Sequence, residues 1–198
     1  KYRDYFQRGR YHFLIYNLDG SIKGDNSGLY FPPISYVKEL EFFVYYKNKW
    51  VNLHKGLKKI RIETFETSHF FEIGDLKIKL DVFLSDNNPA LRYFIDANKK
   101  VKFKVKPVIE FNFVHGYHKN PVKGYGFRKE KGKIICESNY DEKIVLMMDA
   151  SEKLEMEGKD KINFLKFNMK KGFVNFVCSE KSEREALSVF KNLKKDTK

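Results

Sequence analysis

The segment from Lys58 to Ile109 constrains the fold most, because it reads as a succession of antiparallel strands. Its last part, from Val101 to Pro107, alternates strictly between apolar residues and lysine. A period of two with lysine on one side describes a strand with one solvent face and one buried face. The chain is therefore predicted to be a β protein. These strands carry no clustered nucleophile, base or metal ligands, so we expect any chemistry to lie outside this polypeptide.

Length and composition favour one folded domain. A chain of 198 residues can bury a sizeable core, and 42% hydrophobic residues with 19 Phe and 12 Tyr exclude a disordered chain. No run of 18 apolar residues and no signal-peptide pattern is present, which favours a cytoplasmic protein without a membrane span. The lysine-rich composition with two cysteines is also typical of thermophile proteins.

A formal charge of +13 raises the possibility of nucleic-acid binding. Only seven of the 39 basic residues are Arg, however, and Arg is the residue suited to bidentate recognition of bases and phosphates. Most of the lysines instead occupy every second position of the expected strands. This pattern indicates a solvated face that also blocks edge-to-edge aggregation. Nucleic acid is therefore an unlikely partner.

The strand signals predict an antiparallel two-sheet β-supersandwich of about twelve strands. Gly74-Asp75 is expected to turn one hairpin, between residues 68–73 and 76–84, and Ala97-Asn98 a second, between residues 90–96 and 100–109. Near the carboxyl end, Ser182 and Glu185 form a capping-box pattern that predicts one amphipathic helix. We therefore expect a sandwich domain over residues 1–180, followed by a helix and linker stub over 181–198.

Few residue clusters suggest catalysis or metal binding. The only close histidine pair is His115 and His118, for which loop residues are favoured over metal ligands. Two carboxylates flanking a glycosidic oxygen are what glycoside hydrolysis requires. Sequence alone places no two of the candidate acids at that separation, so no catalytic residue, metal or cofactor is predicted. The candidates are Asp81, Glu110, Asp141, Glu142 and Asp149.

Aromatic residues around Trp50 are the remaining candidates for a binding surface. Trp50, together with Phe42, Tyr45 and Tyr46, could present rings on which the apolar face of a sugar stacks. Alternatively, alternate residues such as Phe43 and Tyr45 fill the core, and this interpretation is favoured for those rings. Trp50 stands just past an expected hairpin turn and is the least secure assignment to the core.

The segment Arg10-Tyr-His-Phe-Leu-Ile-Tyr16 resembles the amino-terminal Arg-Tyr-His-Gly-Leu-Leu segment of prokaryotic glycogen-debranching enzymes of the amylo-α-1,6-glucosidase type. Phe71-Glu-Ile-Gly74, Ala90-Leu-Arg-Tyr93 and Val105-Lys-Pro107 are similar to later strands of that family, and the resemblance covers roughly residues 8 to 180. It implies a β-supersandwich that precedes an (α/α)6-barrel catalytic domain, which carries the catalytic acids. The helix from Ser182 resembles the connector to that barrel.

The sequence therefore favours the noncatalytic amino-terminal domain of a glycogen-debranching-type glycoside hydrolase. Such a domain would brace a helical-barrel catalytic domain or subunit and line part of an α-glucan site. The resemblance implies a substrate-facing or domain-facing role for Arg10, Tyr11 and His12, and Trp50 is the candidate stacking residue. Two alternatives remain open: a stand-alone carbohydrate-binding module, and a basic β-sandwich that binds an anionic polymer such as nucleic acid.

Overall fold

A computed structural model gives the protein a mainly antiparallel β fold with one carboxyl-terminal helix, as predicted. It describes residues 4–8, 13–17, 19–23, 27–32, 34–63, 66–86, 88–113, 124–139 and 144–193. The elements are β1 (Asp4–Arg8), β2 (Phe13–Asn17), β3 (Gly28–Phe31), β4 (Ile34–Tyr46), β5 (Lys49–Asn52), a 3-10 turn (Leu53–Gly56), β6 (Leu57–Ile62), β7 (Glu66–Ile73), β8 (Leu76–Leu84), β9 (Ala90–Phe113), β10 (Tyr125–Glu130), β11 (Lys133–Ser138), β12 (Val145–Ala150), β13 (Glu155–Glu157), β14 (Phe164–Ser179) and α1 (Glu183–Leu193).

The described strands form one hydrogen-bonded sheet that folds into two layers, here called sheet A and sheet B, which share β9 and β14. In sheet A the order is β6-β7-β8-β9-β14-β12-β11-β10, with β9 contributing residues 90–97 and β14 residues 171–179. In sheet B the order is β1-β2-β3-β4-β9-β14-β13, with β9 contributing residues 101–113 and β14 residues 164–169. The short strand β5 pairs with the end of β4. Hydrogen bonding is therefore continuous from one sheet to the other.

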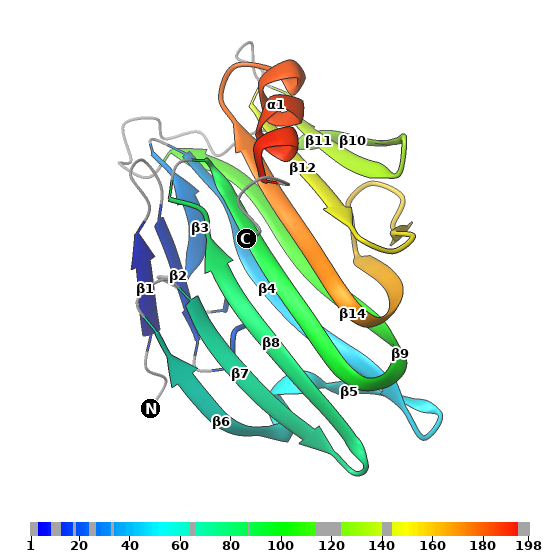
Figure 1. Ribbon diagram of the computed structural model, residues 1–198. Helices are drawn as coiled ribbons and strands as arrows, with labels where there is room; N and C mark the ends of the chain where they lie inside the picture. The colour runs from blue at the N-terminus through cyan, green and yellow to red at the C-terminus, as the bar shows by residue number, and fades with distance from the viewer. Residues whose placement is uncertain are drawn as a thin grey trace.

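The corner between the sheets is made by β9 and β14, which fold over together at the lower right of Figure 1. The register shifts there, so that residues 97–100 of β9 stand opposite Lys170 of β14 alone. The side chain of Asn98 anchors this bulge to the β7–β8 turn: its Oδ1 accepts from the Lys77 amide at 3.0 Å, and its Nδ2 donates to the Asp75 carbonyl at 2.8 Å. Extra residues on one strand of a pair bend it sharply.

The main core lies between the two sheets. Phe42 of β4 in sheet B meets Tyr93 of β9 in sheet A, with ring centroids 4.8 Å apart. A second contact between the sheets is a hydrogen bond from the Tyr16 hydroxyl of β2 to the Thr67 hydroxyl of β7, at 2.7 Å. As the alternation predicted, Val101, Phe103 and Val105 are buried here. The pleat sends every second side chain of each strand into this space.

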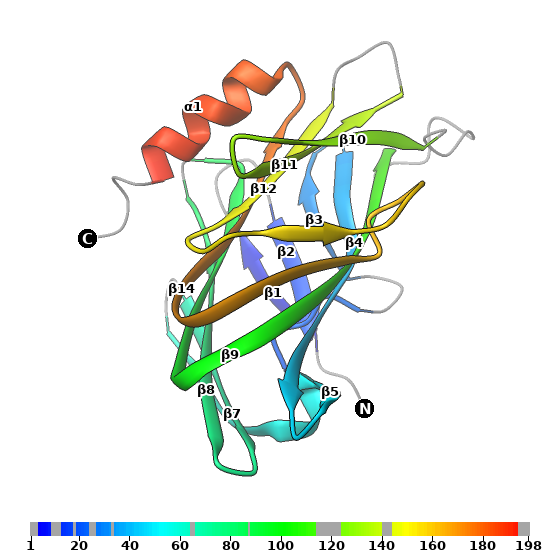
Figure 2. The ribbon, with the colours of Figure 1, turned by 90° about the vertical axis from the view of Figure 1, so that its right-hand side faces the viewer.

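Helix α1 covers the outer face of sheet A, beside β12 and β14 (Figure 2). Its apolar stripe forms a second buried cluster with the outward residues of β9, β11, β12 and β14. Only half of the predicted capping box forms: the Ser182 hydroxyl accepts from the Glu185 amide at 3.2 Å, but the Ser182 amide and the Glu185 carboxylate both bond to the Ser179 hydroxyl instead of to each other. Arg92, buried in β9, donates to the Leu193 carbonyl at the other end of the helix at 3.3 Å. The helical residues in the cluster are Ala186, Val189, Phe190 and Leu193.

Two details differ from the sequence prediction. Residues 90–96 and 100–109 do not form a hairpin; they belong to the single strand β9, which bends at Ala97-Asn98 instead of turning back on itself. The described residues form fourteen strands where about twelve were expected: β1, β3 and β6 are additional, while β9 and β14 each join two strands that were expected separately. The expected hairpin at Gly74-Asp75 is confirmed, with Ile73 opposite Leu76.

Candidate carbohydrate-contact surface

Trp50 lies on the outer face of sheet B, where β5 folds back along β4. The hairpin turn consists of Lys47 and Asn48, both of which have positive φ (46° and 61°), as a tight two-residue connection requires. The turn pairs Trp50 with Tyr45, and their ring centroids are 5.3 Å apart in an edge-to-face arrangement. Trp50 is 36% exposed. The hairpin therefore holds an accessible indole ring in a defined position.

A lysine packs against the Trp50 ring. The Nζ atom of Lys104, on β9, lies 4.8 Å from the Trp50 ring centroid and 4.1 Å from that of Phe164 on β14. Next along β9, the Nζ atom of Lys102 lies 5.6 Å from the Tyr45 ring. Cation–π contacts of this kind favour an ordered ammonium beside each ring. Aromatic and cationic groups from four strands, β4, β5, β9 and β14, thus meet on one face.

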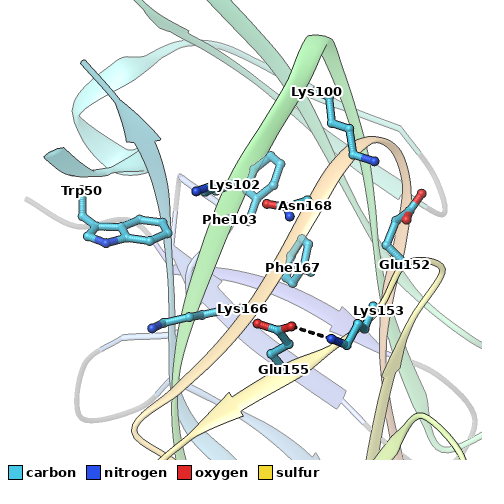
Figure 3. Close-up of a pocket in the computed structure, with 10 residues that line it drawn as sticks. All are labelled: Trp50, Lys100, Lys102, Phe103, Glu152, Lys153, Glu155, Lys166, Phe167 and Asn168. Carbon is cyan, nitrogen blue, oxygen red and sulfur yellow. Dashed lines mark ion pairs between the residues drawn. The ribbon is translucent and has the colours of Figure 1, made fainter. Parts of the chain in front are cut away.

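Beside Trp50 the surface is hollowed over a volume of about 390 Å³. Trp50 forms one side, the strands β9 and β14 form the floor, and the β12–β13 connection with β13 forms the opposite side (Figure 3). The cross-strand register explains the grouping, because Lys102 stands opposite Asn168 and Lys104 opposite Lys166. The lining residues are Trp50, Lys100, Lys102, Phe103, Glu152, Lys153, Glu155, Lys166, Phe167 and Asn168.

Two acidic residues near the hollow are each paired with a lysine. Glu155 accepts a bond from Lys153, with Nζ and Oε1 2.9 Å apart, and this hydrogen bond lowers the pKa of Glu155. Glu157 is paired with Lys166, and the hydrogen bond from that lysine lowers the pKa of Glu157. Both acids therefore remain carboxylates at neutral pH, with their charges offset by their partners.

The rings of this surface were partly misassigned from the sequence. Phe43 and Tyr45 were expected to fill the core, but Tyr45 is 37% exposed and Phe43 is only partly buried. Phe42 and Val44 point inward instead, at 3% and 0% exposure. In a strand, neighbouring side chains point to opposite faces, so an error of one residue exchanges the two sets.

The other candidate residues are dispersed or lie outside the described part of the chain. Arg10, Tyr11 and His12, predicted to face substrate or another domain, fall outside the described residues, as do the histidine pair at 115 and 118 and the acids at 141 and 142. The remaining three acids each contact a different residue. Asp81 binds Lys79 at 2.8 Å, Glu110 lies 3.7 Å from Lys38, and Asp149 accepts from Asn175 at 2.7 Å.

Within the described ranges, no three His, Cys, Asp or Glu side chains are grouped as a metal ion would require. The helix described there is too short and too polar to cross a membrane. The buried residues Cys136 and Cys178 are free thiols. The hollow beside Trp50 is notable because it adjoins an exposed tryptophan, and sequence reasoning approached it only through Trp50 itself.

The fold is an antiparallel β-supersandwich with a helix on one outer face. Comparison with solved structures shows that it matches part of a "Putative kojibiose phosphorylase from human microbiome", with a TM-score of 0.54 and 11% sequence identity. The match covers 97% of this chain and 33% of that protein, so the chain spans about a third of its length. No family model matches the sequence, and no curated protein matches it. At this identity the likeness establishes a shared fold.

Proposed function

We propose that this chain is the noncatalytic β-sandwich domain of a glycogen-debranching-type glycoside hydrolase. In this role it braces an (α/α)6 catalytic domain and contacts α-glucan through the surface around Trp50. The observation that carries the proposal is the structural match, which covers nearly all of this chain but a third of a protein whose name describes a glycoside phosphorylase. Nearly complete coverage of this chain with partial coverage of the matched protein is expected for one domain of a larger carbohydrate-active enzyme.

Two features of the site support a contact role without catalysis. Asp81, Glu110 and Asp149 are bound to different partners on different strands, whereas glycoside hydrolysis requires two carboxyl groups facing one bond. Trp50 is exposed beside a hollow, which is where a ring that stacks on sugar must lie. The domain would therefore position a glucan chain while another domain cleaves it.

The test is a titration of the purified chain with maltoheptaose and glycogen, following Trp50 fluorescence and reducing-sugar release together. Trp50 is the only tryptophan, so its signal reports this surface alone. We expect a saturable change in fluorescence without sugar release. By calorimetry, Trp50→Ala should lose about tenfold in affinity, whereas Ile62→Ala, a control at a residue that is 60% exposed on β6, should bind normally. Sugar release by the purified chain would overturn the noncatalytic role.

A second candidate is a basic β-sandwich that binds an anionic polymer. It is favoured by the row of lysines on the outer face of β9, where Lys102 and Lys106 are exposed. Counterion release predicts that such binding weakens strongly with salt. Fluorescence titration with heparin and with single-stranded DNA at 50 and 300 mM NaCl separates this candidate from the first, because stacking of a neutral sugar is nearly independent of salt.

A stand-alone carbohydrate-binding module would bind glucan through the same surface as the first candidate, but without a catalytic partner.

A further inference from the structure

The polar groups that remain available in the hollow beside Trp50 are mostly cationic. In the described part of the chain, no carboxylate lies within 4.0 Å of the ammonium groups of Lys100, Lys102 or Lys104. The two nearby acids with partners, Glu155 and Glu157, are paired with other lysines. Positive charge therefore exceeds negative charge on the Trp50 side of the hollow.

The spatial arrangement separates this charge from the acid that would oppose it. Lys102 and Lys166 extend toward Trp50, whereas Glu152 lies across the hollow from it (Figure 3). Lys104 is held against the Trp50 ring itself. A ligand that packs against the indole would thus meet three ammonium groups before it approached Glu152.

The donor and acceptor properties of these side chains decide between neutral and anionic ligands. An ammonium group only donates hydrogen bonds, whereas a sugar hydroxyl both donates and accepts. A hollow that selects neutral sugars by hydrogen bonding therefore needs acceptors. Of the two carboxylates in the described lining, Glu155 is paired with Lys153 and Glu152 lies across the hollow from Trp50, which leaves Asn168 as the neutral polar side chain among the lysines. In its dianionic form the phosphate of a monoester has only acceptor oxygens, and its bonds to ammonium groups are charge-assisted.

We propose that the hollow beside Trp50 binds a hexose phosphate monoester. The sugar ring packs on the Trp50 indole, and the phosphate contacts Lys102, with Lys104 beside the indole and Lys100 at the far end of the row. The volume of about 390 Å³ is at the lower end of the range for small-molecule sites, which suits one hexose unit rather than a folded polymer. This inference rests on the proposed carbohydrate role and specifies in addition that the bound sugar carries a negative charge.

The test compares glucose 6-phosphate, glucose and inorganic phosphate as ligands of the full chain at one ionic strength, by Trp50 fluorescence and calorimetry. Glucose 6-phosphate should bind about tenfold more tightly than either control, since each ammonium contact at an exposed site adds a modest increment. Lys102→Gln should remove most of this advantage. Lys58→Gln, which deletes the same charge from an exposed position on β6, should leave it intact. Circular dichroism confirms that both variants fold.

The outcomes are distinct. Equal binding of glucose and glucose 6-phosphate would overturn the proposal, as would equal binding of inorganic phosphate alone, which would indicate an anion site without sugar recognition. The absence of any response to glucose 6-phosphate would also overturn it. Titration with a phosphorylated maltodextrin shows whether the preferred ligand is a phosphate ester on a glucan chain or a free sugar phosphate, because the preferred form binds more tightly. Failure of maltoheptaose to bind while glucose 6-phosphate binds would reject the neutral glucan contact and leave this inference standing.

Discussion

Replacing Phe190 by alanine should increase the fraction of molecules in which helix α1 opens away from sheet A. Phe190 is 6% exposed and lies in the cluster between the helix and sheet A. An isolated helix of 11 residues is marginal in water, so packing against the sheet is what holds α1 in place. Removing a buried phenylalanine costs about 3 kcal/mol or more, which raises the equilibrium for opening about a hundredfold.

Amide hydrogen exchange measures this opening segment by segment. In Phe190→Ala, amides of α1 should exchange about a hundredfold faster, while those in the centre of β9 and β14 keep their relative protection. Ser188→Ala, on the exposed side of the same helix, should leave exchange nearly unchanged. If helix and sheet amides accelerate together in Phe190→Ala, the helix opens only when the whole domain unfolds, and the reasoning from local packing is refuted.

Three further predictions concern the interior and one turn. Burial lowers the pKa of His69, so as the pH falls below about 6.5 the imidazole takes up a proton in the unfolded chain but not in the folded one. The free energy of unfolding should then decline by up to about 1.4 kcal/mol per pH unit. In urea unfolding between pH 7.5 and 5.5, His69→Phe should flatten this decline. Burial also raises the pKa of Cys136 and Cys178, so a thiol reagent should label the native chain far more slowly than the urea-unfolded chain; equal rates would contradict their burial. Gly74 has a φ of 62° and leaves no room for a Cβ beside the Tyr46 hydroxyl, so Gly74→Ala should cost about 1–2 kcal/mol or more, and an unchanged thermal midpoint would count against this.

Local patterns predicted the hairpins and the helix but not the corner. The turn at Gly74-Asp75 and the helix cap at Ser182 depend on residues close in sequence, and both are present. The break at Ala97-Asn98 looks the same locally, yet it is a bend rather than a turn. Its outcome depends on pairing with β14, whose partner residues lie some 60 to 90 positions away. No local pattern contains that information.

The candidate site was predictable to the same limited extent. Trp50 could be singled out because a lone tryptophan beside a turn is a poor candidate for the core. The exposure of Tyr45 depends on which face of β4 is buried, and a shift of one residue reverses the answer. The contacts of Lys104 with Trp50 and Phe164 join three strands through the register of β9 and β14. Such contacts are properties of the assembled sheet.

The position of β14 also has a consequence for synthesis of the protein. It is the last strand of the described chain, yet it occupies an interior position in both sheets, between β9 and β12 in one and between β9 and β13 in the other. Until Phe164–Ser179 has left the ribosome, neither sheet can close, and the inner edge of β9 has no partner. The nascent chain must therefore expose a long unpaired strand edge until β14 emerges, and chaperones are expected to bind there.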